Sequence, residues 1–252
     1  ANQTQLRLEV VIVGTAMDPV VGDFRAHNEE LLDVWHQRAH AWLEESGVSS
    51  WDVSIRRGAT VPVLLAEART AEMLVMGSRG HGLVFGSLSG SVSQHVARHA
   101  SCPVVVVRPP RQANARQIVV GIDGSEGAQQ ALRFACTRAS ATGDPVLAVH
   151  AFRPWSLSPR IETALHTTAR DVEETDRLFT DTTQKVRDDF VDVDLTTAAV
   201  AGSADRVLID FSADASLVVV GSRGRDAFAE MLLGSVAQQV LHRAQCAVAI
   251  VR

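Results

Sequence analysis

The sequence predicts an α/β protein made of two tandem, doubly wound parallel sheets with helices on both faces, related by internal duplication. Short apolar runs alternate with amphipathic helical periods along the 252 residues, which is the pattern of βαβ units. A glycine stretch, G-x2-G-x9-G-S, also occurs twice, beginning at Gly77 and at Gly221. The match continues at a constant offset of 144 residues to Arg108 and Arg252. Glycines recurring at three fixed offsets indicate that a whole domain has been duplicated.

The first domain is expected over residues 1–108. Apolar or alternating runs bounded by turn residues predict strands, and apolar residues repeating every three or four positions predict helices. Asp23 suits the N-cap of the first helix, Gly47 suits its stop, and Pro62 fits the first turn of the second helix. We expect strands over residues 6–13, 51–56, 73–76 and 102–107, a loop over 14–22, and helices over 23–46, 61–69 and 90–99.

Residues 109–117 are predicted to be a linker between the two domains. Two prolines follow a strand there, and the residues after them show no helical or strand periodicity.

The second domain is expected over residues 118–252. Its first strand ends in the turn Asp123-Gly124-Ser125, where Ser125 or Asp123 caps the next helix. We expect strands over residues 118–122, 145–151, 192–199, 216–220 and 246–251, and helices over 126–139, 159–190, 203–212 and 234–243.

The two halves are unequal at their starts. The counterpart of Asp123 would fall before residue 1, so the first half lacks the opening strand and helix of the second. A sheet without that strand would expose an edge and apolar helix faces. We therefore expect that this polypeptide starts inside its first domain.

Composition narrows the class of protein. A net charge of −5 with mixed signs indicates no nucleic-acid groove, and the apolar runs are too short to span a membrane. The first residues lack the basic and apolar regions of a signal peptide. Three cysteines suit a reducing, cytoplasmic compartment, and Cys102 and Cys246 lead into apolar strands as buried thiols.

The repeated stretch joins a strand, a glycine loop and a helix N-terminus. The first N–H groups of a helix are unpaired and the helix dipole favours negative charge there, so this arrangement can bind a phosphate. Ser91 and Ser235 can add hydroxyl donors. No lysine follows the glycines as in a Walker A loop. The alternative is that the glycines only serve tight turns and helix packing.

These residues resemble the universal stress protein family in its tandem two-domain form. The resemblance rests on both glycine stretches, on Val-Gly-Ile-Asp-Gly-Ser at 120–125, and on the two closing apolar strands that begin at Cys102 and Cys246. It implies a five-stranded parallel sheet in each domain and ATP, possibly with magnesium, between the glycine loop and the first turn. It also implies that strands 104–107 and 248–251 pair edge to edge, as a homodimer or an internal pseudo-dimer.

The resemblance assigns site residues by their motif positions. Asp123 would contact the nucleoside, although it could instead cap the following helix. The acids Asp226 and Glu230 depart from the usual pattern and could repel phosphates, while Arg223 and Arg225 could offset them. The remaining residues implied for nucleotide binding are Val220, Gly221, Gly224, Gly234, Ser235 and Val236 in the second half, and Met76, Gly77, Gly80, Gly90, Ser91 and Val92 in the first.

Other candidate residues favour structural roles. The pairs His36/His40 and His95/His99 have helical spacing without a metalloprotease pattern, so we expect packed or surface histidines. Trp35 and Trp42 are expected in the core. Arg79 and Arg223 could contact phosphate or simply lie in exposed turns.

The most consistent function is a cytoplasmic ATP-binding regulatory protein of the stress response, which acts through nucleotide-dependent conformation or an unknown protein partner. Two phosphate-type loops without an evident catalytic base favour binding over catalysis. One alternative is a slow ATPase or self-phosphorylating protein that uses Ser91 or Ser235. The other is a dimeric scaffold that binds no nucleotide.

Overall fold

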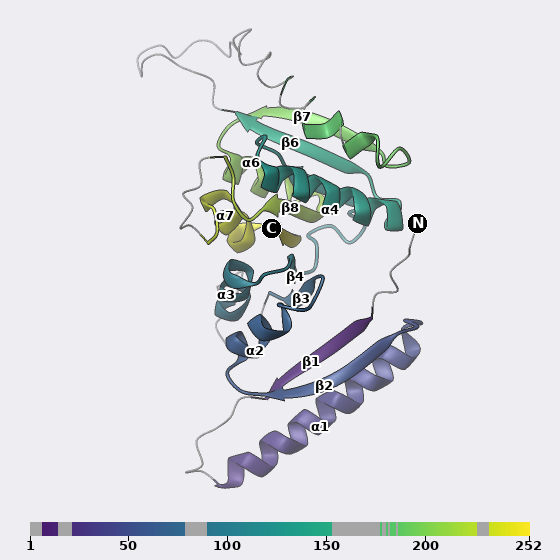
Figure 1. The fold of residues 1–252 in the computed structure, drawn as a ribbon, viewed down its shortest axis with the longest axis vertical. Coiled ribbons are helices and arrows are strands. Elements are labelled where there is room, and N and C mark those ends of the chain that lie inside the picture. The colour runs from purple at the N-terminus through teal and green to yellow at the C-terminus, as the bar shows by residue number, and fades with distance from the viewer. Residues whose placement is uncertain are drawn as a thin grey trace. The chain divides into compact units, whose positions relative to one another are not determined.

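The computed structural model describes residues 7–14, 22–78, 90–152, 177, 180, 182–184, 186–225 and 232–252 (Figure 1). The chain divides into two compact units, Ala1–Glu67 and Ala68–Arg252. The described strands and helices alternate along the chain, as the sequence predicts.

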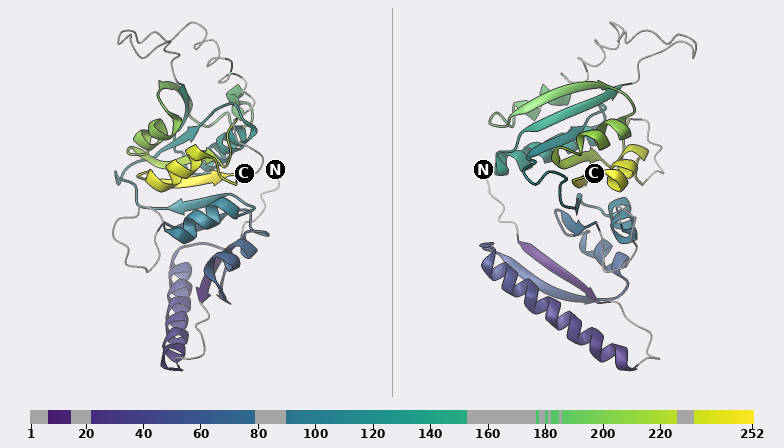
Figure 2. Two further views of the ribbon diagram at one scale, coloured as in Figure 1. Left: turned by 90° about the vertical axis from the view of Figure 1, so that its left-hand side faces the viewer. Right: turned by 180° about the vertical axis from the view of Figure 1, so that it is seen from behind.

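The first unit is a two-stranded parallel sheet with two helices. It contains β1 (Leu8–Gly14), α1 (Gly22–Glu45), β2 (Trp51–Arg57) and α2 (Thr60–Glu67). The pairing of β1 with β2 runs without a shift from Leu8 opposite Trp51 to Gly14 opposite Arg57. Helix α1 lies along this sheet (Figure 2). It begins one residue before the expected cap Asp23 and ends before Gly47, whose positive φ of 74° confirms the predicted stop.

The prediction for the tryptophans of α1 is wrong. Trp35 and Trp42 are 39% and 62% exposed, whereas Leu32 and Leu43 are buried. Leu32 and Leu43 share one stripe of the helix, while the tryptophans lie on a neighbouring stripe. A two-stranded sheet offers a narrow surface, which accounts for burial of one stripe only.

The second unit contains a seven-stranded sheet in the order β3-β4-β9-β8-β5-β6-β7. All neighbours in this sheet pair in parallel except β4 and β9, which are antiparallel, with Val105 opposite Ala249. This pair confirms that the closing strands of the two halves join edge to edge. The strands are β3 (Leu74–Gly77), β4 (Val104–Val107), β5 (Gln117–Gly121), β6 (Val146–Phe152), β7 (Leu195–Ala201), β8 (Ala215–Gly221) and β9 (Ala247–Val251).

Helices pack on the strands of this sheet. They are α3 (Ser91–His99) of the first half, and α4 (Glu126–Thr142), α6 (Ala204–Phe211) and α7 (Ser235–Arg243) of the second. Of the long helix expected over 159–190, residues 153–176 lie outside the described part, and residues 182–184 are helical. Ile118, Val120 and Val219 pack with Leu132 and Cys136 of α4 in the core. Among the described helices, none has the length and apolarity needed to cross a bilayer.

The two halves differ at the centre of the sheet. The second half forms the expected five-stranded parallel arrangement, β9-β8-β5-β6-β7. By the repeat, β4, β3, β1 and β2 correspond to β9, β8, β6 and β7, and no described strand of the first half corresponds to the central β5. The first half therefore contributes four strands to two separate sheets, and β3 ends the larger one.

Candidate functional site

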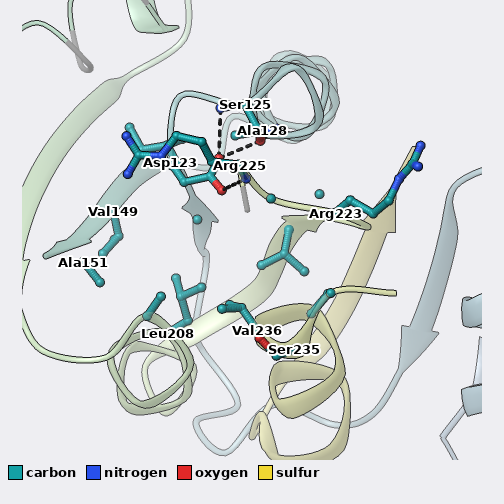
Figure 3. Close-up of a pocket in the computed structure, with 18 residues that line it drawn as sticks. Asp123, Ser125, Ala128, Val149, Ala151, Leu208, Arg223, Arg225, Ser235 and Val236 are labelled. Carbon is teal, nitrogen blue, oxygen red and sulfur yellow. Dashed lines mark hydrogen bonds between the residues drawn. The ribbon is translucent and has the colours of Figure 1, made fainter. Parts of the chain in front are cut away.

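A cavity of about 280 Å³ opens beside the second glycine stretch (Figure 3). It lies beyond the carboxyl ends of the parallel strands β5, β6 and β8, which is where α/β sheets bind ligands. The sequence-predicted residues Asp123, Val220, Gly221, Gly224, Gly234, Ser235 and Val236 all line it. The structure therefore brings together every residue that the motif suggested for the second half.

Apolar side chains from several elements form one wall of this cavity. Ile122 follows β5, Val149 and Ala151 come from β6, and Leu208 comes from α6. The motif does not reveal these residues, because they are spread along the chain. For Ile122, Val149 and Ala151, a position near the carboxyl end of a predicted strand was the available signal, whereas Leu208 lies in a helix and had none. Such a wall suits the flat, largely apolar face of a nucleobase.

The start of α7, next to α6, forms another side of the cavity (Figure 3). The Ser222 N–H donates to the Val251 carbonyl at 2.7 Å, and the Gly234 N–H donates to the Ser222 carbonyl at 2.7 Å, so the end of β8 is tied to the helix start. Gly234 is the N-cap (φ −67°, ψ 156°), and no described side chain caps the helix. The first-turn N–H groups from Ser235 onward therefore have no partner within the helix, which makes this terminus a suitable phosphate site.

Asp123 connects the turn after β5 with the glycine loop. One carboxylate oxygen accepts from the Ser125 N–H at 3.0 Å and from the Ser125 hydroxyl at 2.6 Å, and the other accepts from the Arg225 N–H at 3.0 Å (Figure 3). Ser125 is the N-cap of α4 and accepts from the Ala128 N–H at 3.2 Å. Of the two caps predicted for α4, Ser125 is therefore the one used.

The glycines of the loop differ in the space that their neighbours leave for a Cβ atom. A Cβ on Gly221 would lie 2.8 Å from the Gly127 carbonyl carbon, and a Cβ on Gly224 would lie 2.5 Å from an Asp123 oxygen. These two glycines are required by packing. A Cβ on Gly234 would meet its nearest neighbour, the Ser222 carbonyl oxygen, at 3.5 Å, an ordinary contact at an ordinary φ. Packing therefore does not require a glycine at 234, and the missing side chain leaves the backbone open to the cavity.

The first half repeats the local geometry of the motif. The Ser78 N–H donates to the Val107 carbonyl at 3.0 Å, and the Gly90 N–H donates to the Ser78 carbonyl at 2.6 Å. Gly90 is the N-cap of α3 with φ −74° and ψ 155°. Met76 and Gly77 end β3, while Ser91 and Val92 begin α3. Gly80 and Arg79, together with Asp226 and Glu230 of the second half, lie outside the described residues.

The histidine pairs are structural in the described geometry. His95 and His99 are exposed and bond backbone carbonyls of their own helix through Nδ1 at 3.0 and 2.9 Å. His36 and His40 are half-buried, with ring centroids 4.6 Å apart, and His40 contacts the ring of Trp51. Both pairs match the packed or surface roles expected from the sequence.

All three cysteines are buried, which confirms the prediction for Cys102 and Cys246. Burial raises the pKa of the Cys136 thiol to about 11 and that of Cys246 to about 12. It raises the pKa of Cys102 as well. These thiols therefore stay protonated, and unreactive as nucleophiles, near neutral pH.

A model of the universal stress protein family matches residues 1–108 and 114–252. A universal stress protein of Mycobacterium tuberculosis is 36% identical over 199 residues, which are 76% of this chain and 65% of that protein. The chain thus spans less than two thirds of that relative's length.

A solved structure that covers most of the chain has the same fold. The crystal structure of a universal stress protein from Archaeoglobus fulgidus matches with a TM-score of 0.66 at 17% identity, over 97% of this chain and 86% of that chain. Another from that organism, solved in complex with dAMP, matches with a TM-score of 0.42 at 23% identity, over 58% of this chain and 100% of that chain. The family match in both halves shows that this chain belongs to the universal stress protein family and carries its domain twice in tandem.

Proposed function

We propose that the cavity of the second half binds ATP and that the protein acts as a nucleotide-dependent regulator of the stress response. The observation that carries this proposal is the uncapped start of α7, with Gly234 and Ser235 at a cavity whose other wall is apolar. A nucleotide has the same two parts, an apolar base and an anionic phosphate chain. The phosphates would lie at α7 and the base against Val149, Ala151 and Leu208.

In this proposal each motif residue has a distinct task. Val220 and Gly221 flank the base and ribose, while Gly224, Gly234, Ser235 and Val236 hold the phosphates, with which magnesium would enter. A carboxylate has about four acceptor sites, and three of those on Asp123 are used by Ser125 and Arg225. One site remains for a ribose or base donor. Asp123 thus both positions the loop and contacts the nucleoside.

The first half supplies part of a second site through Met76, Gly77, Gly80, Gly90, Ser91 and Val92. No described residue of that half corresponds to Asp123, so we propose that the second half is the complete site. Regulation would take place in the cytoplasm, through nucleotide-dependent conformation or a protein partner.

One other function is a scaffold that binds no nucleotide, and it is favoured by the first half, in which no described residue corresponds to Asp123. The same titration separates the two functions, since a scaffold shows no heat and no thermal stabilisation with ATP. ATP hydrolysis would be an additional activity. It would appear as release of phosphate by the wild-type protein that is lost in Ser235→Ala.

The test is calorimetric titration of magnesium–ATP into the protein and into two matched variants. Gly234→Val should abolish binding, because its side chain occupies the space of the phosphates, while the ordinary contacts at this position keep the fold. Gly90→Val is the control at the equivalent position of the first half. We expect a stoichiometry near one that is lost in Gly234→Val and kept in Gly90→Val. Wild-type affinity in Gly234→Val would show that the assigned site is wrong.

A further inference from the structure

A second hollow, of about 410 Å³, lies next to the cavity on the side of α4. It shares Ser125, Arg223 and Gly224 with the cavity, so the two spaces meet at the glycine loop. Its lining consists of polar residues and glycines only: Ser125, Glu126, Gly127, Gln130, Ser222, Arg223, Gly224 and Arg252. A wholly polar lining distinguishes this hollow from the cavity, which has an apolar wall.

The charges of the hollow favour an anion. Arg223 and Arg252 contribute two positive charges, and Glu126 is the one carboxylate among the lining residues. No described carboxylate lies within ion-pair distance of either arginine. Figure 3 shows the Arg223 side chain leading away from Ser235 and Val236, so it is not directed at the phosphate site proposed on α7.

The Arg252 guanidinium is held by a hydrogen bond and keeps further N–H groups that can donate to a ligand. One of its terminal N–H groups donates to the Ala97 carbonyl of α3 at 2.6 Å. Its Nε is buried and has no hydrogen-bond partner among the described residues. A guanidinium has five N–H donors, so N–H groups besides the buried Nε–H and the one bonded to Ala97 remain for a ligand. Arg223 and Arg252 line the same hollow, so an anion bound there would be attracted by both positive charges. Burial and, to a lesser extent, the positive charge of Arg223 lower the pKa of Arg252.

We propose that this hollow binds a phosphate group through Arg223 and Arg252, with the hydroxyl of Ser222 as an additional donor. Guanidinium pairs suit phosphate oxygens because their planar N–H groups match the geometry of the anion. The group can be free phosphate or the terminal phosphate of a nucleotide in the neighbouring cavity. Only the second source depends on the proposed ATP function.

The experiment titrates inorganic phosphate into the nucleotide-free protein, followed by calorimetry and by the Nε–H resonances of ¹⁵N-labelled arginine. Arg223→Gln is the main variant, because Arg223 is exposed and its loss leaves the core intact. We expect it to weaken phosphate binding about tenfold or more. Arg243→Gln removes an exposed arginine outside the hollow and should leave binding unchanged. Glu126→Gln removes the opposing charge and should tighten binding about two- to fivefold.

A further arm identifies the source of the phosphate. If the hollow binds the terminal phosphate of a nucleotide, ATP should compete with inorganic phosphate and AMP should not. If neither ATP nor AMP changes the affinity for inorganic phosphate, the hollow binds free phosphate. Either result supports the proposal that the hollow binds a phosphate group. Absence of phosphate binding by the wild-type protein would overturn the proposal, as would wild-type affinity in Arg223→Gln. These results do not depend on whether ATP binds, so the two proposals can fail separately.

Discussion

The same glycine motif has different surroundings in the two halves of the molecule. Its local hydrogen bonds are alike, since the N-caps Gly90 and Gly234 both donate to the carbonyl of the residue after the strand, at 2.6 and 2.7 Å. The second copy also faces β5, the Asp123 turn and α4, which complete the cavity. No described element of the first half takes those places. The motif therefore specifies a strand–loop–helix turn, while a full pocket requires walls from elsewhere in the chain.

The two halves also hold each other through equivalent arginines. Arg108, at the end of the first repeat, donates to the Ala244 and Leu241 carbonyls at the end of α7, at 2.7 Å each. Arg252, its counterpart, donates to the Ala97 carbonyl of α3. Each guanidinium thus meets the negative end of the other half's motif helix, where a cation is favourable. The exchange is reciprocal but unequal, because Arg108 makes two of these hydrogen bonds and Arg252 makes one among the described residues.

The largest expected difference between the halves is at the first motif glycine. Gly221→Ala places a methyl group against the backbone of Gly127, so α4 or β8 must move, at a cost of about 3 kcal/mol in the free energy of unfolding. Gly77→Ala is the matched control, because Gly77 is exposed at the end of β3. Urea unfolding curves measure both. Equal losses would show that α4 does not distinguish the two copies.

A smaller difference is expected between the reciprocal arginines. Arg108→Met should lower the free energy of unfolding by about 2 kcal/mol, because it leaves two helix-end carbonyls without their buried donor. Arg252→Met removes one such bond and should cost about 1 kcal/mol. Thermal unfolding of both variants checks the ranking. The reverse order would mean that the bonds of Arg108 are not the stronger link between the halves.

The last difference is a pH dependence from the equivalent cysteines, which is negligible near neutral pH. The Cys246 thiol has a pKa of about 12 in the folded protein against 9.0 for a free thiol. The unfolded chain therefore loses this proton first, and stability falls as the pH rises from 9 towards 12, by at most about 1.4 kcal/mol per pH unit. Cys246→Ala should flatten the fall in denaturant midpoints measured between pH 8 and pH 10.5.

Cys102→Ala is the control for this pH series. Cys102 is 6% exposed while Cys246 is fully buried, so its raised pKa should contribute less. An unchanged slope in Cys246→Ala would contradict the assignment.

Most of the fold follows from local patterns. Alternating apolar runs and helical periods predicted the described strands and helices to within a few residues, since each pattern is set by its own element's geometry. The constant offset between copies predicted that the first half lacks the opening strand of the second, and the family resemblance predicted the pairing of β4 with β9. The tryptophans of α1 were misassigned because helical spacing shows which residues share a stripe but not how wide the opposing sheet is.

The sequence by itself determined the duplication, the α/β class and the motif residues that line the cavity, because spacing along one strand–loop–helix unit fixes their relative positions. Only the tertiary structure decided which walls enclose the site. Val149 and Ala151 reach the cavity because parallel strands bring their carboxyl ends to one edge of the sheet, and Leu208 reaches it from α6. It also separated Gly221 and Gly224, which packing requires, from Gly234, which packing leaves free, because close approach between distant segments cannot be read from spacing.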